Sequence, residues 1–334
     1  MIARTAAPAQ NPPLWQRQAA EAVRDADTLW RLLELPAEGL PAARAAAATF
    51  GLRVPRPYLA RMRPGEPDDP LLRQVLPVAA ELAPAPMGFT ADPVGDGPAQ
   101  RETGLLQKYH GRALLLASGA CGVHCRYCFR RHYPYAEAGA GRWEAALAAI
   151  AADPSLEEVI LSGGDPLSLA DHRLADLVAA IEAIPHVRRL RLHTRQPVVL
   201  PARVDAQLLE WLGGTRLATV VVWHINHPRE IDTEVAAAAG RLREAGATQL
   251  NQAVLLAGVN DSVEAQAQLA TASLDAGILP YYLHTLDRVA GAAHFESDVD
   301  TAALVEGLRR RLPGYLVPRL VREEAGGAYK TPLD

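Results

Sequence analysis

The chain of 334 residues has 34 basic and 38 acidic side chains, a formal net charge of −4, and 49% hydrophobic residues. This content supplies a large core and excludes wholesale disorder, while the charge gives no general attraction to nucleic acid or anionic membranes. No run reaches the ~18 apolar residues of a membrane span, and residues 1–13 lack the apolar core of a secretory signal. The three cysteines fall within eight residues, which excludes an even disulfide framework and favours a reducing, cytoplasmic environment.

Residues 1–105 are predicted to form a mainly helical, proline-rich accessory segment. Apolar side chains recur at helical spacing over residues 14–35, and proline is dense from residue 55 to residue 98. Proline at this density blocks long helices and central strands, so we expect short helices joined by extended connectors. The segment either covers the following domain or forms a subunit interface, and the second role would make the protein a homo-oligomer.

Residues 106–315 alternate apolar, strand-like runs with helical stretches in six strand–helix units. Near-continuous apolar strands are typical of buried parallel sheets. Polar residues stand at or near the strand ends, at Ser118–Cys121, Ser162–Asp165, His193–Arg195, His224–Asn226, Asn251–Gln252 and His284–Asp287. In a barrel these ends surround one cavity, whereas in an open, doubly wound sheet they would lie along an edge. We therefore predict an α/β fold, a partial (β/α)6 barrel of the TIM type, followed by a C-terminal tail over residues 316–334.

Cys121, Cys125 and Cys128 form a C-x3-C-x2-C pattern after the first predicted strand of the barrel. Three thiolates from one loop can hold three irons of a [4Fe–4S] cluster and leave the fourth iron open to a small molecule. The alternatives are inert thiols or a zinc site completed by His124 or His132. Structural zinc sites usually combine two C-x2-C pairs, and the sequence has no second pair.

The cysteine pattern, with Tyr127 before the last cysteine, resembles the radical S-adenosylmethionine (SAM) superfamily. In that superfamily the open iron binds SAM, and an electron from an external donor cleaves SAM to a 5′-deoxyadenosyl radical. Gly163, Gly164 and Asp165 resemble the element that holds the methionyl amine, although alone they would indicate an ordinary strand-to-helix turn. Four further residues near strand ends are assigned to the SAM site, namely His224, Asn226, Gln252 and Arg195.

Longer segments resemble the lysine 2,3-aminomutase family, most closely its short branch, which supplies (R)-β-lysine for elongation factor P. The similarity covers nearly the whole chain, including RALLLASGACGVHCRYCFRRHYPY, LSGGDPL, HINHPREID, LNQAVLLAGVND, LPYYLHTLDRVAGAAHF and GYLVPRLVREEAGGAYKTPLD. The resemblance implies an isomerase with L-lysine as substrate and pyridoxal 5′-phosphate (PLP) as a second cofactor, bound to a lysine. It also implies a functional link to elongation factor P and its lysyl ligase, without direct contact with nucleic acid or membrane.

Lys330 matches the PLP-binding lysine of the family. The sequence has two lysines, Lys108 and Lys330. Arginine cannot replace a nucleophilic amine because its guanidinium stays protonated. From its position alone, Lys330 would be taken as a solvated lysine of the tail. The resemblance further implies that Lys108, Tyr109 and Arg112 meet the PLP phosphate, although a Lys/Arg pair at a strand entrance is more often surface charge.

Three residues match substrate contacts of the family. Arg130 corresponds to the arginine that holds the substrate α-carboxylate, and Asp287 to an aspartate that holds the ε-ammonium group. Glu323 stands where other aminomutases of the family have a second aspartate and is one methylene longer. Two alternatives remain at this point: an aminomutase that serves metabolism on lysine or another α-amino acid, and a non-catalytic iron–sulfur or zinc protein.

Overall fold

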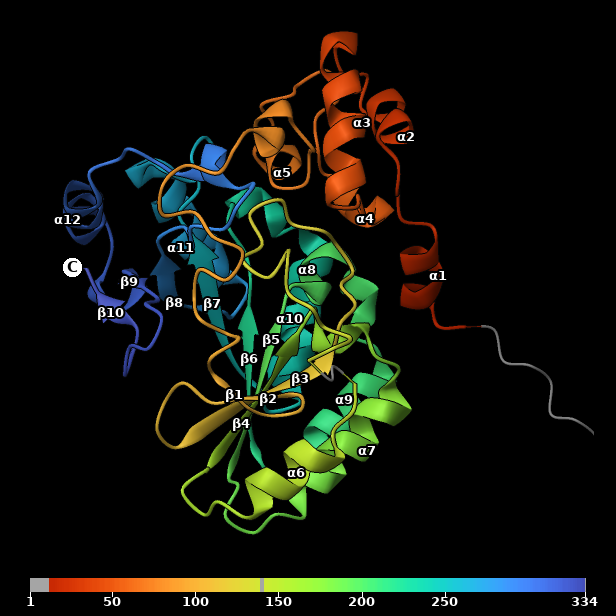
Figure 1. The fold of residues 1–334 in the computed structure, drawn as a ribbon, viewed down its shortest axis with the longest axis vertical. Helices are drawn as coiled ribbons and strands as arrows, with labels where there is room; N and C mark the ends of the chain where they lie inside the picture. Colours follow the sequence, from red (N-terminus) through yellow and green to blue (C-terminus); the bar gives the residue numbers. More distant parts are fainter. Residues whose placement is uncertain (1–11, 139–140, 334) are drawn as a thin grey trace, which may run out of the picture.

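The computed structural model describes residues 12–138 and 141–333, which form one ten-stranded sheet with helices around it (Figure 1). The strands follow chain order across the sheet: β1 (Gln100–Glu102), β2 (Leu105–Leu106), β3 (Arg112–Ser118), β4 (Glu158–Gly163), β5 (Arg189–Thr194), β6 (Ala218–Trp223), β7 (Thr248–Val254), β8 (Leu279–His284), β9 (Arg319–Arg322) and β10 (Thr331–Pro332). Strands β3 to β9 run parallel, and the short outer strands pair antiparallel. No helix among the described residues is both long enough and apolar enough to cross a membrane.

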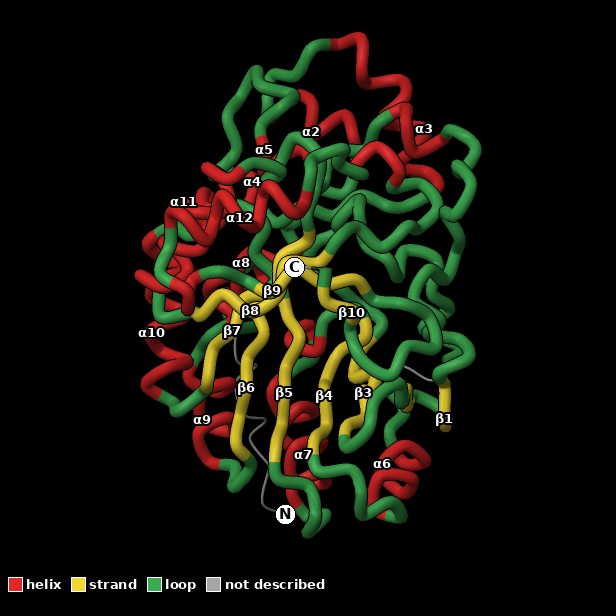
Figure 2. The backbone as a smooth tube through the Cα atoms, turned by 90° about the vertical axis from the view of Figure 1, so that its left-hand side faces the viewer, coloured by secondary structure: helices red, strands yellow, loops and turns green. Residues whose placement is uncertain are grey.

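The central strands alternate with helices, as the sequence predicts. The units β3 to β8 are followed in turn by α6 (Glu144–Ala151), α7 (Asp171–Glu182), α8 (Gln196–Val199) with α9 (Ala206–Gly214), α10 (Thr233–Glu244), α11 (Val263–Asp275) and α12 (Thr301–Arg311). Figure 2 shows these strands side by side, with β9 and β10 continuing the sheet. Within the described residues the sheet does not close, since β1 and β10 remain its edges, so the prediction of a partial barrel with six strand–helix units is confirmed.

Helix α10 shows how the sequence produces these units. The Asp232 carboxylate accepts a hydrogen bond from the Val235 N–H and so caps the first turn. The side chains that the helix buries recur three and four residues apart, at Val235, Ala238, Ala239 and Leu242. This apolar stripe joins the main hydrophobic core, which runs from the barrel into the N-terminal segment.

The strands at both ends of the sheet differ from the expectation. The predicted accessory segment supplies β1 and most of the β1–β2 hairpin, so the expected boundary at residue 105 falls inside β2. The predicted tail forms β9, parallel to β8, and β10, antiparallel to β9. These strands have two to four residues, too few to produce a recognisable pattern in the sequence.

The remaining N-terminal segment consists of short helices joined by extended connectors: α1 (Leu14–Ala20), α2 (Ala26–Leu32), α3 (Leu40–Thr49), α4 (Arg56–Leu59), α5 (Pro70–Arg73) and a 3-10 turn, η2 (Ala79–Leu82). In Figure 1, α2 to α5 lie beyond the ends of the strands. Gln74 bonds to Arg195 and Asn226, which directly follow or lie just beyond the carboxyl ends of β5 and β6. The segment therefore covers the barrel at its carboxyl end, while a homo-oligomer stays a prediction.

Two glycines at the end of β4 bring the backbone there close to the backbone at the start of the cysteine loop. The Gly164 N–H donates to the Ser118 carbonyl at 2.7 Å, and the Asp165 N–H donates to the Ala120 carbonyl at 2.8 Å. Gly163 has φ +121, which L side chains rarely adopt, and a Cβ on Gly164 would collide with the Ala120 carbonyl oxygen. Close backbone approach therefore requires glycine at both positions.

We expect Gly164→Ala to lower the free energy of unfolding by about 1–3 kcal/mol, because backbone atoms must shift to admit the methyl group. Gly240→Ala is the matched control, since Gly240 lies inside α10 with open space around its Cβ position. That change should stabilise the protein by about 0.5–1 kcal/mol through helix propensity. Urea denaturation measures both, and equal effects would contradict the close approach.

Candidate active site

The cysteine loop is fixed by the N-terminal segment. The Arg126 N–H donates to the Gln74 carbonyl, and the His124 N–H donates to the Arg53 carbonyl. The Arg126 guanidinium is fully buried and forms an ion pair with Glu81, which also pairs with Arg131. A buried arginine requires such a carboxylate because an unpaired buried charge is strongly destabilising. Glu81 thus ties two arginines of the loop to the segment that covers it.

The thiols are suited to a bound iron–sulfur cluster. Burial, followed by the neighbouring thiols, raises the pKa of Cys121, and burial together with Cys125 raises that of Cys128 to about 11. Thiolate forms here need compensating positive charge, which bound iron supplies. The donor set of three thiolates on one loop therefore fits the predicted [4Fe–4S] cluster.

His124 and His132, the candidate fourth ligands of a zinc site, make contacts with the backbone. Within residues 12–138 and 141–333, no three His, Cys, Asp or Glu side chains are arranged around a single ion. His124 directs Nδ1 to the Gly51 carbonyl at 2.8 Å, and His132 directs Nε2 to the Ala290 carbonyl at 3.0 Å.

Asp165, which follows β4, is hydrogen-bonded to the carboxyl end of β5. Its carboxylate accepts hydrogen bonds from the Thr194 hydroxyl and from the backbone N–H groups of Leu167, Arg195 and Gln196. Burial raises its pKa to about 6 despite these donors. Because its acceptor positions are used by the chain itself, Asp165 holds Gly163 and Gly164 in place in this structure. Its predicted role as acceptor for the methionyl amine stays a prediction.

Arg195, also predicted to bind SAM, uses its guanidinium for contacts with other side chains of the protein. Its Nη2 donates to Gln74 and to Glu230, and its Nη1 lies 3.4 Å from the Cys125 sulfur. Asn226 lies in the same network, where its Nδ2 donates to Gln74 and to the Tyr127 hydroxyl. Gln252 is half-buried in β7, opposite Tyr282 of β8.

Three imidazole groups line the barrel with unpartnered nitrogen atoms. The Nε2 atoms of His193, His224 and His284 are buried and have no hydrogen-bond partner among the described residues. Burial, and then nearby positive groups that include Lys330, lowers the pKa of each of them, that of His224 to about 4. Neutral imidazoles with free nitrogens suit a polar ligand inside the barrel, since such atoms are otherwise costly to bury.

A chain of ion pairs connects the tail to the cysteine loop. Lys330 Nζ lies 2.6 Å from one oxygen of Glu323, and Lys108 Nζ lies 2.9 Å from the other. Lys108 also pairs with Asp96 at 2.7 Å, and Asp96 pairs with Arg130 at 2.6 Å. Burial alone would raise the pKa of Glu323, but the two ammonium groups lower it to about 2. The structure thus brings five predicted or newly found charged residues together.

Asp287 and Glu323 share a cavity of about 580 Å³. It is bounded by residues 88–93 of the N-terminal segment, the turn after β8 and the connection that follows β9. Burial, followed by repulsion from Glu323, raises the pKa of Asp287 to about 7. Two carboxyl groups at one cavity form a suitable place for an ammonium group.

The three residues predicted to contact the PLP phosphate lie just before β3 or at its first residue. Tyr109 interacts with Glu323, so it lies beside the ion-pair chain that contains Lys108. The Arg112 guanidinium stacks over the Tyr109 ring, 4.7 Å from its centroid, at the first residue of β3. The cysteine loop follows the opposite end of the same strand. The structure therefore brings Lys108 and Tyr109 to Lys330, while Arg112 reaches them through Tyr109.

Comparison with known proteins places the chain in a family. A family model described as a 4Fe-4S single cluster domain matches residues 110–190, which include all three cysteines. L-lysine 2,3-aminomutase of Escherichia coli (strain K12) is 50% identical over 96% of this chain and 94% of its own length. The chain belongs to the lysine 2,3-aminomutase family. It is therefore an enzyme of the isomerase class.

Other members of this family are similar over nearly the whole chain. The L-lysine 2,3-aminomutase of Haemophilus influenzae is 45% identical over 95% of this chain and 94% of its own length, and that of Clostridium subterminale is 33% identical over 96% and 77%. Among solved structures, Streptococcus suis SuiB has a TM-score of 0.45 at 16% identity, covering 65% of this chain and 50% of SuiB. A radical SAM methyltransferase from Sphaerobacter thermophilus has a TM-score of 0.42 at 18% identity, over 65% and 68%.

Several residues of the site in this aminomutase are not identified from the sequence. Gln74, Tyr58 and Glu230 surround Arg195, and Asp96 links Lys108 to Arg130. Only His193 and His284, as polar residues near strand ends, carried a signal that places them near the cavity. The others lie in helices of one turn, at a helix end or in irregular segments, where no periodic pattern marks a buried polar side chain.

Replacing Asp287 tests the charge balance of the cavity. The groups that act on its carboxyl are Glu323, Lys330, Lys108 and Asp96. The carboxyl of Asp287 has a pKa of about 7 in the folded state, against a reference value of 3.8. Its ionisation therefore lowers the free energy of unfolding as pH rises from about 4 to about 7, and this loss persists above pH 7. We expect Asp287→Asn to stabilise the ligand-free protein on the order of 1–2 kcal/mol at pH 8 and hardly at all at pH 4. Thermal unfolding across this range measures it, and a gain independent of pH would contradict the assignment.

Proposed function

We propose that this enzyme converts L-lysine to (R)-β-lysine by moving the amino group from C2 to C3. The observation that carries the proposal is the arrangement around Glu323, where Lys330 and the cavity with Asp287 meet at the end of an ion-pair chain that begins at the cysteine loop. The relatives at 45–50% identity are named L-lysine 2,3-aminomutase, which supports the choice of substrate.

Cys121, Cys125 and Cys128 would hold a [4Fe–4S] cluster, and SAM would bind at its open iron beside Gly163 and Gly164. Lys330 would hold PLP covalently, with Lys108 and Tyr109 beside its phosphate. When bound, these groups would supply a 5′-deoxyadenosyl radical that removes and returns hydrogen, and a conjugated π system that lets the amino nitrogen move to the neighbouring carbon. The protein orients the partners and excludes water from the barrel.

Arg130 and the acidic cavity would hold the two ends of lysine. The contacts described for Arg130 use Nε and Nη1, toward Asp96 and Ser162, which leaves Nη2 for the substrate α-carboxylate. Asp287 and Glu323 would accept hydrogen bonds from the ε-ammonium group. Lys330 already places an ammonium group on Glu323 in this structure, so this carboxylate can bind the group that the substrate carries.

Lys330→Ala should abolish the absorption band at about 400–430 nm that a protein with covalently bound PLP shows. Lys108→Arg is the matched control, because Lys108 is the only other lysine of the sequence and its ammonium group is held by two carboxylates and the Val94 carbonyl. The control should keep the band, and borohydride reduction followed by peptide mapping should label residue 330. A band that survives in Lys330→Ala would refute the assignment.

Substrate recognition is tested with lysine and norleucine, which lacks the ε-ammonium group. Reconstituted enzyme with SAM and dithionite should form β-lysine and should leave norleucine unchanged. Glu323→Gln should lower kcat/KM for lysine about 10–100-fold, since a hydrogen bond to a charged group is lost, while Glu323→Asp should keep more of the activity. Preference for alanine or glutamate over lysine would contradict the proposed substrate.

We further propose that the product serves the modification of elongation factor P by a separate lysyl ligase. The support for this role is the likeness to the short branch of the family noted in the sequence. Deleting the gene should remove β-lysine from elongation factor P, as intact-protein mass spectrometry would show. Unchanged modification, with loss of free β-lysine instead, would favour an enzyme that serves metabolism.

A further inference from the structure

We infer that Arg195 is a positioning residue that raises the reduction potential of the iron–sulfur cluster, and that the N-terminal segment sets this effect by holding Arg195 in place. The inference rests on the proposed function only in that Cys125 binds the cluster. It concerns a contact between a guanidinium and a ligand sulfur, and it gives the N-terminal segment a role in the redox chemistry besides covering the barrel and pairing its charges.

Arg195 reaches the cysteine loop from the end of β5. It directly follows Thr194, the last residue of that strand, and its Nη1 lies 3.4 Å from the Cys125 sulfur. The same Nη1 contacts the hydroxyl of Tyr127, which lies between Cys125 and Cys128. Arg195 is 5% exposed. Its positive charge therefore acts on the sulfur with little screening by water.

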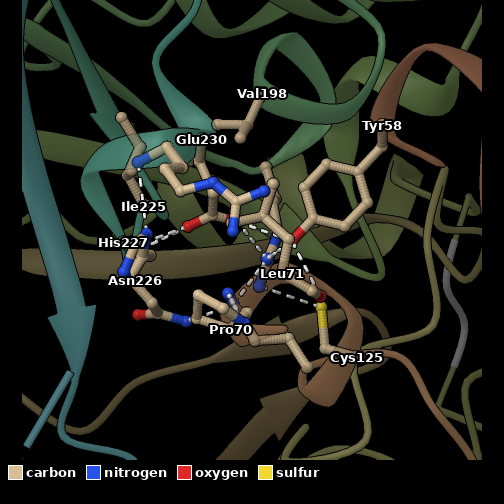
Figure 3. A network of polar contacts seen from close by, with 12 residues as sticks. Tyr58, Pro70, Leu71, Cys125, Val198, Ile225, Asn226, His227 and Glu230 are labelled. Atoms are coloured by element: carbon tan, nitrogen blue, oxygen red, sulfur yellow. Dashed lines mark hydrogen bonds and ion pairs between the residues drawn. The ribbon is translucent and has the colours of Figure 1, made fainter. Parts of the chain in front are cut away.

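The second terminal nitrogen holds this orientation. Nη2 donates to Glu230 at 2.5 Å, to Gln74 at 2.7 Å and to the Tyr58 hydroxyl at 3.1 Å, and all three partners are fully buried. In Figure 3 the side chains of Tyr58, Glu230 and Cys125 surround the same small region. Tyr58 and Gln74 belong to the N-terminal segment, so this segment determines where the guanidinium points.

Glu230 is itself anchored. Its Oε2 accepts hydrogen bonds from the N–H groups of Asn226 at 2.6 Å and His227 at 3.0 Å, and its Oε1 accepts from Tyr58 at 2.9 Å. The buried guanidinium thus has a fixed counter-charge, which offsets much of the cost of its burial. Because Nη1 is the nitrogen turned to the sulfur, Cys125 lies on the positive side of this ion pair, and a cluster bound there would meet the guanidinium rather than the carboxylate.

Reduction adds one electron from an external donor to the cluster, and the added negative charge spreads onto the ligand sulfurs. A cation and an N–H donor at the Cys125 sulfur stabilise the reduced form more than the oxidised form. Hydrogen bonds to sulfur and the local charge are established means of setting such potentials. Arg195 should therefore make the cluster easier to reduce, which is the step that precedes cleavage of SAM.

The test is a redox titration with dithionite, followed by the electron paramagnetic resonance signal of the reduced cluster, on the full chain reconstituted without SAM or lysine. Arg195→Gln should weaken electron uptake about tenfold, which is about 59 mV to more negative potential for a one-electron couple. Arg195→Lys keeps the charge and should restore part of this shift. Glu230→Gln keeps an oxygen that accepts from Nη2 and so keeps the orientation of Arg195, but it removes the counter-charge and should shift the potential in the opposite direction.

Arg203→Gln is the matched control. Arg203 is an equally buried arginine, and its described contacts are with Asp171, Asp205, the carbonyls of Leu167 and Leu169, and the ring of Trp15. Its loss should destabilise the protein and leave the potential unchanged. Shifts of opposite sign for Arg195→Gln and Glu230→Gln support the inference, because a purely structural effect has no reason to change sign.

Unchanged potentials in both variants, or shifts in the same direction, would overturn the inference. If Arg195→Gln does not take up the cluster, Tyr58→Phe and Gln74→Met decide. Each removes one partner of Nη2 without changing charge. A more negative potential in these two supports the inference, and wild-type potentials in both overturn it. A wild-type chain that takes up no cluster would contradict the proposed function instead.

Discussion

Three buried arginines near the cysteines impose the main constraint on this structure, because each needs a carboxylate inside the protein. Arg126 pairs with Glu81, Arg130 with Asp96, and Arg195 with Glu230. Breaking a buried pair leaves an uncompensated charge and costs several kcal/mol. Glu81 and Asp96 both belong to the N-terminal segment, so this segment supplies two of the three counter-charges at the barrel end. The segment thus completes the active site electrostatically while it covers it.

The second dependence concerns the C-terminal tail, whose strand pairing delivers the lysine to the site. Strand β9 pairs with β8, and β10 returns antiparallel beside it. This places Glu323 directly after β9 and Lys330 directly before β10, and Glu323 pairs with both Lys330 and Lys108. A glutamate at position 323 has the reach to bind both ammonium groups at once. The tail and the cysteine loop are thereby connected through one chain of ion pairs.

The sequence predicted those parts of the fold that have a local pattern. Strands β3 to β8 are apolar or, in β5 and β7, alternating runs next to helices, and the structure confirms all six units within the described residues. The strands β1, β2, β9 and β10 were not predicted, because two to four residues at a sheet edge carry no periodicity. The prolines identify the accessory segment in the sequence, but no pattern identifies its buried polar residues, such as Gln74. A polar residue in an irregular segment looks the same in sequence whether it is buried or solvated.

By itself the sequence determined the chemistry that depends on short spacing and on family likeness. The thiols of Cys121, Cys125 and Cys128 lie on one loop, so their spacing favours a shared cluster, and the family likeness decides between a cluster and a zinc site. Only the tertiary structure decided which partners the charged groups take. Tyr58 and Glu230 are 172 positions apart, and Lys108 and Glu323 are 215 apart. No local pattern links such residues, because their contact is produced by the order of strands in the sheet and by the need to pair every buried charge.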